Sequence, residues 1–285
     1  MATGKSSLGV VKQVVLGQTL LEGAGVRVCR TLGQSQTRVD PFLMLDELKL
    51  PVGQATKGFP DHPHRGIATL TIMLKGTMEH RDSLGNQGVI SDGACQFMVA
   101  GRGVIHSERP IARDPSSELH GFQLWVNLPA ANKMVKYVFQ PVRHRRFVSW
   151  THLRSPLFFY DRPSYQDIGP EEIPTVDWAD MGSGSVRVLA GSWNGTNGPI
   201  QVHHSQNIVL LDLKLDKGRF STALADGFNC FCYVYEVRLI SLTSKRADGL
   251  THWFLPLLYT GHGGSWRQEC RAAKCVYTRS VGWAD

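Results

Sequence analysis

The feature that most constrains the fold of this chain is a series of strand-length apolar runs separated by turn residues. Three of these runs are ATLTIML (68–74), CQFMV (95–99) and GVIHSE (103–108). The breaks between runs, including Lys75-Gly76 and Asp92-Gly93, carry the residues that tight turns prefer, and the chain has 29 glycines and 14 prolines in all. Runs of this length and spacing predict short strands rather than long helices.

The strand pattern occurs twice along the 285 residues. A first series extends to GFQLWVNLP (121–129), and a second begins near Val186 with VRVLAG and continues to FNCFCYVYE (228–236). Elements of one kind, repeated in two blocks, favour two packed β units in series. We therefore predict an all-β protein with two barrels in tandem.

Two segments interrupt this pattern. Residues 137–162 mix aromatic residues with arginines, and residues 237–285 lack a sustained strand or helix period. Each segment carries a charge of +4 within a formal net charge of +7, so the rest of the chain is close to neutral and no nucleic-acid surface is expected. The predicted division is an N-terminal barrel (1–136), an atypical insertion (137–162), a partial second barrel (163–236) and an atypical tail (237–285).

The sequence favours an intracellular protein without membrane association. No run of about 18 apolar residues occurs, and residues 1–10 lack the pattern of a secretory signal. The six cysteines form no regular framework, so we expect free thiols. Cys230 and Cys232 form a C-x-C pair in an apolar strand pattern, where ordinary burial is favoured over metal or redox chemistry.

Two short motifs carry candidate metal ligands. His62 and His64 lie two residues apart in DHPHRG, and His106 and Glu108 repeat that spacing in HSE, 42 residues after His64. In an extended chain, residues i and i+2 project from the same face, so each pair can reach one ion. Two such pairs on neighbouring strands would converge inside a barrel.

Three imidazoles and one carboxylate suit a divalent metal ion. Four protein ligands in a six-coordinate sphere leave two open positions, which favours Fe(II) over the closed tetrahedral sites of Zn(II). Mn, Ni, Co and Cu stay open on ligand type alone. An isolated H-x-H pair also arises by chance in a chain with eleven histidines. Of the other histidines, His80 could line the barrel, and His120, His203 and His204 are interpreted as surface or packing residues.

Several segments resemble signature segments of the pirin family, within the cupin superfamily. The resemblance rests on FPDHPHRG (59–66), MEHRDSLGN (78–86) and, above all, QFMVAGRGVIHSERP (96–110). DPFLMLDE (40–47) and FQLWVNLP (122–129) extend it. The similarity covers about residues 8–135 and continues more weakly from about 163 to 236.

The resemblance implies a bicupin fold with one Fe ion in the N-terminal barrel, bound by His62, His64, His106 and Glu108. It also implies two activities. One is cleavage of a flavonol-like molecule with O2, as in quercetin 2,3-dioxygenase, with Glu108 as ligand and base. The other is a role as an iron-dependent nuclear cofactor that binds a transcription factor or another protein. A monomer in the cytoplasm or nucleus is expected, with a second barrel free of metal because it shows no H-x-H or H-x-E pair.

The chain also departs from the family pattern. Residues 137–162 look inserted, and the resemblance stops after Glu236, as retained intron or frame-shifted coding sequence would produce. The second barrel is therefore expected to be incomplete, and a damaged, inactive paralogue is a third interpretation. Four apolar residues could line a path to the metal or could simply pack the barrel: Phe42, Phe59, Met73 and Met98.

Overall fold

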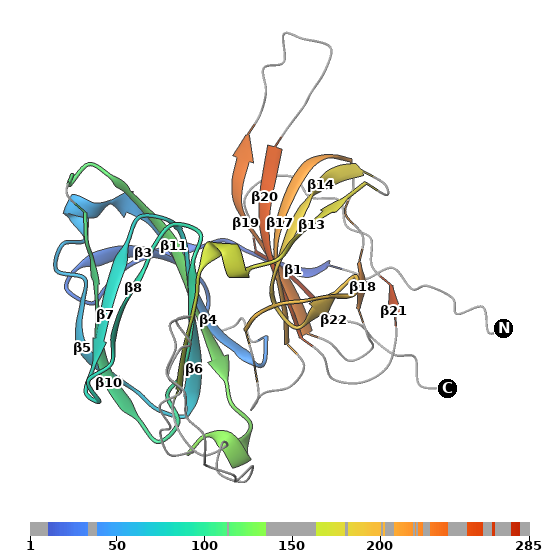
Figure 1. Cartoon of the computed structure of the whole chain (residues 1–285). Helices are drawn as coiled ribbons and strands as arrows, with labels where there is room; N and C mark the ends of the chain where they lie inside the picture. The colour runs from blue at the N-terminus through green and yellow to red at the C-terminus, as the bar shows by residue number, and fades with distance from the viewer. Residues whose placement is uncertain are drawn as a thin grey trace, which may run out of the picture. The chain divides into compact units, whose positions relative to one another are not determined.

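The computed structural model describes residues 11–33, 39–112, 114–134, 164–179, 182–200, 202, 208–218, 220, 222–224, 229–238, 250–258, 264–265 and 275–279. The chain divides into two compact units. The N-terminal unit comprises residues 18–36 and 41–170, and the C-terminal unit comprises residues 1–17, 37–40 and 171–285. Both units consist almost entirely of strands, with only short 3-10 turns, which confirms the expected all-β architecture (Figure 1). Within the described ranges, no helix has the length and apolar character needed to span a bilayer.

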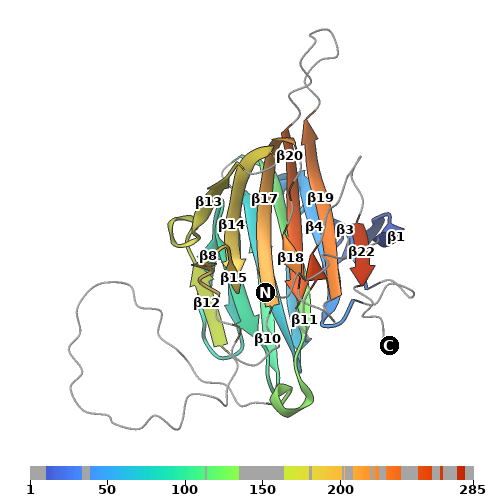
Figure 2. The ribbon, with the colours of Figure 1, turned by 90° about the vertical axis from the view of Figure 1, so that its right-hand side faces the viewer.

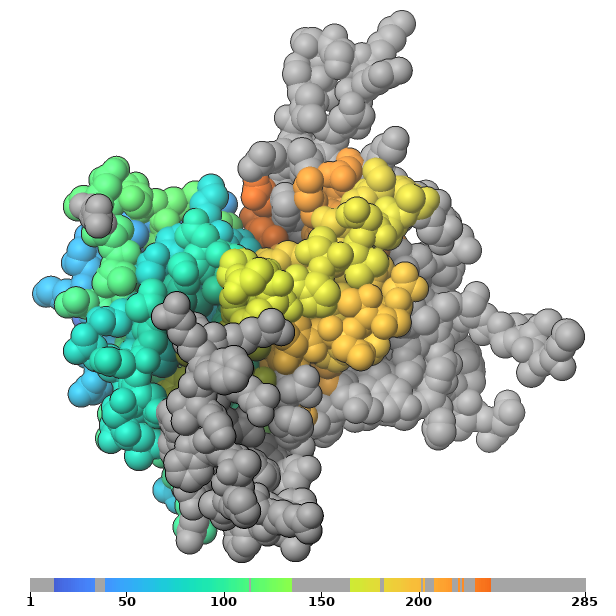
Figure 3. Space-filling view, viewed as in Figure 1, coloured from blue at the N-terminus to red at the C-terminus, as the bar shows by residue number. Residues whose placement is uncertain are grey.

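The N-terminal unit consists of two antiparallel sheets. The larger has seven strands in the order β12-β9-β6-β11-β4-β3-β2, and the smaller has four in the order β5-β10-β7-β8. Figure 1 shows the two sheets as opposite walls of one barrel, and Figure 3 shows one face of this unit, coloured from blue through teal to green. The bounds are β2 (Gln18–Glu22), β3 (Val26–Leu32), β4 (Phe42–Pro51), β5 (Phe59–His64), β6 (Ile67–Lys75), β7 (Met78–Asp82), β8 (Gln87–Ile90), β9 (Cys95–Val99), β10 (Val104–Pro110), β11 (Glu118–Asn127) and β12 (Ser164–Ile168).

The larger sheet alternates apolar and polar rows across its strands. Leu70, Leu124 and Leu45 lie opposite one another on β6, β11 and β4, and all three are fully buried. The next row in register, Thr71, Gln123 and Asp46, faces the other side of the sheet because successive side chains alternate. Burial of the leucine side chains stabilises the sheet. The side chains of the polar row line the cavity of the barrel.

The C-terminal unit contains a seven-stranded sheet in the order β1-β22-β19-β20-β17-β14-β13, whose strands from β13 to β19 lie side by side in Figure 2. Two short pairs, β15 with β16 and β18 with β21, accompany it. The bounds are β1 (Val11–Val15), β13 (Thr175–Trp178), β14 (Gly182–Ala190), β15 (Ser192–Trp193), β16 (Thr196–Asn197), β17 (Ile208–Gly218), β18 (Ala223–Leu224), β19 (Asn229–Arg238), β20 (Leu250–Leu258), β21 (Gly264–Ser265) and β22 (Cys275–Arg279). Cys230 and Cys232 are buried in its core with Val186 and Leu211, so the C-x-C pair packs as expected.

The structure places some strands differently from the sequence interpretation. β1 pairs with β22 in the C-terminal unit, and β12 pairs with β9 in the N-terminal unit. The tail, for which no strand was expected, supplies β20 and β22, so that expectation is corrected. β20 has the apolar run WFLPLL rather than a two-residue alternation, and it pairs with β17 and β19. Residues 137–162 lie outside the described residues.

Candidate metal centre

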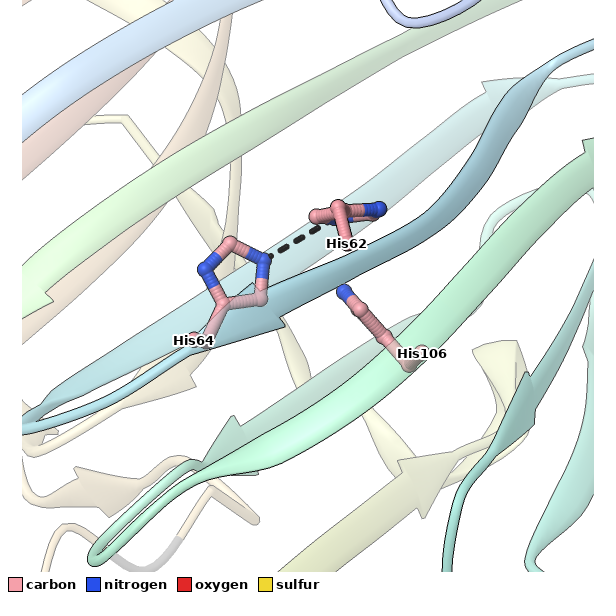
Figure 4. A group of neighbouring side chains, drawn as sticks. All are labelled: His62, His64 and His106. Carbon is pink, nitrogen blue, oxygen red and sulfur yellow. Dashed lines mark hydrogen bonds between the residues drawn. The ribbon is translucent and has the colours of Figure 1, made fainter.

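Strands β5 and β10 bring three of the predicted ligands together. The two strands are antiparallel, and His106 on β10 lies directly opposite His62 on β5. His64 follows on the same face of β5, and one ring nitrogen from each histidine lies within 4.8 Å of the others. Figure 4 shows the three rings converging from the two strands. The two-residue spacing thus places the side chains as the extended-chain argument predicts.

Burial keeps two of these imidazoles neutral. His64 and His106 are only 4% and 1% exposed. Burial, reinforced by the neighbouring histidines, lowers the pKa of His64 to about 4 and that of His106 to about 3. Neutral imidazoles retain a ring-nitrogen lone pair at physiological pH, and that lone pair is what binds a metal.

The hydrogen bonds of the rings fit an ion between them. His62 Nδ1 lies 2.8 Å from the carbonyl oxygen of Pro60, and a carbonyl only accepts, so this nitrogen carries the proton. In the neutral ring, the lone pair is then on His62 Nε2, which lies 3.1 Å from His64 Nε2 (dashed in Figure 4). Both ring nitrogens of His106 are buried without a hydrogen-bond partner in the described part of the chain. Such a buried, unsatisfied polar group is costly unless something binds it.

Glu108 lies close to this cluster but is held differently. A bulge in the pairing with β5 falls between His106 and Glu108, so that Glu108 lies opposite Phe59. Its carboxylate is 5% exposed and accepts hydrogen bonds from Gln123 Nε2 at 3.2 and 3.1 Å. Burial raises the pKa of Glu108, while His62 and the hydrogen bonds from Gln123 oppose that shift. The tight three-nitrogen cluster does not include this carboxylate.

A cavity of about 360 Å³ opens beside the histidines. His62, His64 and Glu108 line it, and its walls are mainly apolar. The Trp125 ring contacts His64 edge to face, with ring centroids 4.9 Å apart. Of the four apolar candidates from the sequence, Phe59 and Met73 line the cavity, whereas Phe42 and Met98 are buried core residues. This volume is within the range of small-molecule sites.

A polar row crosses the cavity wall formed by the larger sheet. Thr71, Gln123, Asp46 and Arg30 are opposite one another on β6, β11, β4 and β3, and all four line the cavity. The sequence interpretation missed this row. Gln123 interrupts the apolar run FQLWV and Asp46 ends the run FLML, which was the available signal, but only the strand register shows that they meet.

A second polar group surrounds His80. His80, on β7, is 2% exposed and lies opposite Glu108 of β10. Its ring stacks on that of Tyr165, with ring centroids 5.1 Å apart. Gln96 Nε2 is 2.6 Å from both His80 Nε2 and Asp167 Oδ1. Because burial lowers the pKa of His80, its Nε2 is neutral and accepts from the Gln96 amide. His80 is therefore inside the barrel, as the sequence suggested, but next to the cluster rather than in it.

The remaining histidines play no part in the cluster as far as the structure describes them. His120 is buried at 3% exposure on β11, and its Nε2 lies 2.8 Å from Glu47 Oε1. It is therefore a packing residue, one of the two roles expected for it. His203 and His204 lie outside the described residues.

Comparisons with known proteins agree with the motif resemblance. The family model described as Pirin matches residues 25–126. A Caulobacter vibrioides protein named "Pirin-like protein" is 37% identical over 91% of this chain and 82% of its own length. A Vibrio cholerae protein named "Putative quercetin 2,3-dioxygenase" is 39% identical over 79% of this chain and 71% of its own. Human Pirin is 35% identical over 77% of this chain and 64% of its own.

Solved structures resemble almost the whole chain. A quercetin 2,3-dioxygenase from Acinetobacter baumannii has a TM-score of 0.66 at 22% identity, covering 98% of this chain and 91% of its own. A protein from Geobacillus kaustophilus has a TM-score of 0.62 at 23% identity, covering 99% of this chain and all of its own. These likenesses bear on the fold, and they confirm the expected architecture of two cupin-type β units.

Proposed function

This chain belongs to the pirin family of the cupin superfamily, and from that premise we propose that its N-terminal unit binds one Fe ion and cleaves a flavonol-like substrate with O2. The proposed ligands are His62, His64, His106 and Glu108. The proposed activity is that of a quercetin 2,3-dioxygenase, the activity named for the Vibrio cholerae relative. We place the protein in the cytoplasm or nucleus as a monomer.

The observation that carries the proposal is the convergence of three ring nitrogens in a buried setting. The hydrogen bond from His62 Nδ1 to the Pro60 carbonyl directs the other ring nitrogen inward, as such hydrogen bonds do for ligand histidines in metal sites. Both His106 nitrogens are buried without a protein partner among the described residues. A bound cation would remove the desolvation penalty of these groups.

Glu108 is the proposed fourth ligand and the base. Gln123 fixes the direction of its carboxylate, and a carboxylate oxygen with imidazole nitrogens forms a donor set for Fe(II), with Mn, Ni, Co and Cu as alternatives. When bound, a redox-active ion at this position supplies the activation of a deprotonated flavonol towards O2 that leads to ring cleavage with release of CO.

The chain's own residues have three tasks in this reaction. The cavity walls, with Phe59, Met73 and Trp125, exclude water and hold a planar ring system. Glu108 accepts the proton of the flavonol 3-hydroxyl, a step within reach of a carboxylate that lines the cavity. Gln123 orients that carboxylate by hydrogen bonds, and the Thr71 hydroxyl in turn donates to Gln123.

The experiment is anaerobic reconstitution with Fe(II), followed by quercetin and O2, with CO and O2 measured in the same vessel. We expect CO release in proportion to the quercetin and O2 consumed. Iron binding without CO release would instead favour the alternative role, an iron-dependent cofactor that binds a transcription factor or another protein. Failure to bind iron or another divalent metal would contradict both functions.

A further inference from the structure

Arg30 forms ion pairs with two carboxylates in the cavity wall, those of Asp46 and Glu22. Its Nε and Nη2 contact Asp46 Oδ1 and Oδ2 at 2.7 and 2.6 Å, and Nη2 also lies 2.8 Å from Glu22 Oε1. All three side chains line the cavity that holds His62, His64 and Glu108. Asp46 and Glu22 are called the carboxylate pair below.

Strand register places Asp46 one strand from Gln123, and Arg30 with its partner Glu22 farther across the sheet. Gln123, which binds Glu108, lies opposite Asp46, and Asp46 lies opposite Arg30. Neighbouring strands are about 5 Å apart, so Arg30 lies on the order of 10 Å across the sheet from Gln123. A planar molecule of two or three fused or linked rings spans a distance of this order.

Apolar residues line the cavity beside this polar row. Met44, Leu48, Met73 and Phe122 line the same cavity. A cavity with apolar walls and a polar row along one side matches a flat ligand with an apolar body and polar atoms at more than one position.

The ion pair is costly to bury, so its position in the cavity calls for a reason. The Asp46 side chain is 6% exposed and that of Arg30 is 18% exposed. Desolvation of such a pair often cancels its Coulomb attraction, and apolar residues of similar volume would stabilise the fold as well or better. The two-point contact with Arg30 also fixes the direction of the Asp46 carboxylate, which is what an orienting group requires.

We propose that the carboxylate pair accepts a hydrogen bond from a phenolic hydroxyl at the end of the ligand remote from the metal centre. A carboxylate is an acceptor only, so a hydroxyl can bind there. Two carboxylates with one guanidinium leave a net negative charge, so a ligand carboxylate is repelled. The cavity thus selects neutral, planar polyphenols. This inference rests on the proposed function, because it places the metal-binding end of the same ligand at the histidines.

The test compares two probes that differ at the remote end. 3-Hydroxyflavone has only the hydroxyl that faces the metal centre, whereas quercetin has further hydroxyls on its other rings. We expect the wild-type protein, with or without iron, to bind quercetin at least about tenfold more tightly, since a hydrogen bond to a charged acceptor is worth that much. Quenching of tryptophan fluorescence measures both dissociation constants, because Trp125 lines the cavity.

Variants of the carboxylate pair should remove this preference. In Asp46→Asn and Glu22→Ala the ratio of the two dissociation constants should fall to less than about threefold, as a charged acceptor is lost. The 3-hydroxyflavone constant should change by less than the quercetin constant. A 3-hydroxyflavone that carries a carboxylate on the remote ring should bind the wild type more weakly than 3-hydroxyflavone does, and Asp46→Asn should relieve that penalty.

The control is Glu118→Gln, which removes an exposed carboxylate that pairs with Lys75 at 2.8 Å. It should retain the wild-type ratio. If Asp46→Asn does not fold, Glu22→Ala decides, because the Glu22 side chain is 38% exposed and tolerates replacement. Equal binding of the two probes by the wild type, or a wild-type ratio in the folded carboxylate variants, overturns the inference and leaves the proposed function standing. Loss of all 3-hydroxyflavone binding in the metal-loaded wild type would instead contradict the proposed function.

Discussion

Gln123 donates hydrogen bonds from its side-chain amide to both carboxylate oxygens of Glu108, at 3.2 and 3.1 Å. The two residues come from opposite walls of the barrel, Gln123 from β11 in the larger sheet and Glu108 from β10 in the smaller one. Gln123 also accepts from the Thr71 hydroxyl at 3.2 Å, which sets the direction of its amide. The polar row of the larger sheet therefore orients a carboxylate of the proposed metal centre.

Replacing Gln123 with Leu should weaken metal binding without unfolding the protein. Leu has a similar volume but cannot donate, so the Glu108 carboxylate loses its orientation. Loss of a residue that hydrogen-bonds a metal ligand typically lowers metal affinity by about 10- to 100-fold. Competition with a metal-sensitive dye measures the affinity. Gln87→Leu, at an exposed position on β8, should leave it unchanged, and equal affinities in the two variants would count against a role for Gln123.

Gly88 leaves room for the His80 ring. A Cβ built at Gly88 would contact His80 Nε2, the atom that accepts from Gln96. Gly88→Ala should therefore displace the ring, break that hydrogen bond and lower the free energy of unfolding by about 1–3 kcal/mol, as overpacking does. Urea denaturation measures the change. Val89→Ala, at the exposed neighbouring position, should change stability by less than about 0.5 kcal/mol, and a similarly small effect of Gly88→Ala would contradict the packing described here.

The sequence predicted the local parts of this site well. The two-residue spacing of His62 and His64 was enough to place both rings on one face, because β5 is extended throughout. The turn residues after β6 and β8 likewise marked real strand ends: Gly76 and Gly93 have φ angles of +92° and +75°, which favour glycine. These features depend on neighbouring residues only.

The parts that depend on strand pairing could not be predicted in the same way. The bulge between His106 and Glu108 shifts the pairing of β10 with β5, so that Glu108 lies opposite Phe59. No local sequence pattern indicates this bulge. Thr71, Gln123, Asp46 and Arg30 become a row only when four strands pair in register. For the same reason, local periodicity could not predict that β1 pairs with β22.

The stability of the metal-free protein should fall as the pH drops below about 6.5. Burial lowers the pKa of His64 to about 4 and of His106 to about 3, whereas unfolded histidines titrate near 6.5. Between pH 6.5 and 4 the unfolded chain therefore binds more protons, so acid favours unfolding. The expected slope is up to about 1.4 kcal/mol per pH unit for each imidazole.

Thermal unfolding of the metal-free protein at several pH values measures this slope. The double variant His64→Gln/His106→Gln lacks both groups and should show a shallower dependence over the same range, because the remaining titrating groups are common to both proteins. An identical dependence would mean that these imidazoles do not titrate differently in the folded and unfolded states.

The most direct test of the proposed centre is the iron content after anaerobic reconstitution and removal of excess metal. His64 and His120 make a matched pair, since both are buried, at 4% and 3% exposure, and only His64 faces the cluster. The wild type and His120→Ala should each retain about one iron per chain, and His64→Ala should retain essentially none, because the remaining ligands lose the chelate geometry. Equal iron content in His64→Ala and the wild type would contradict the account.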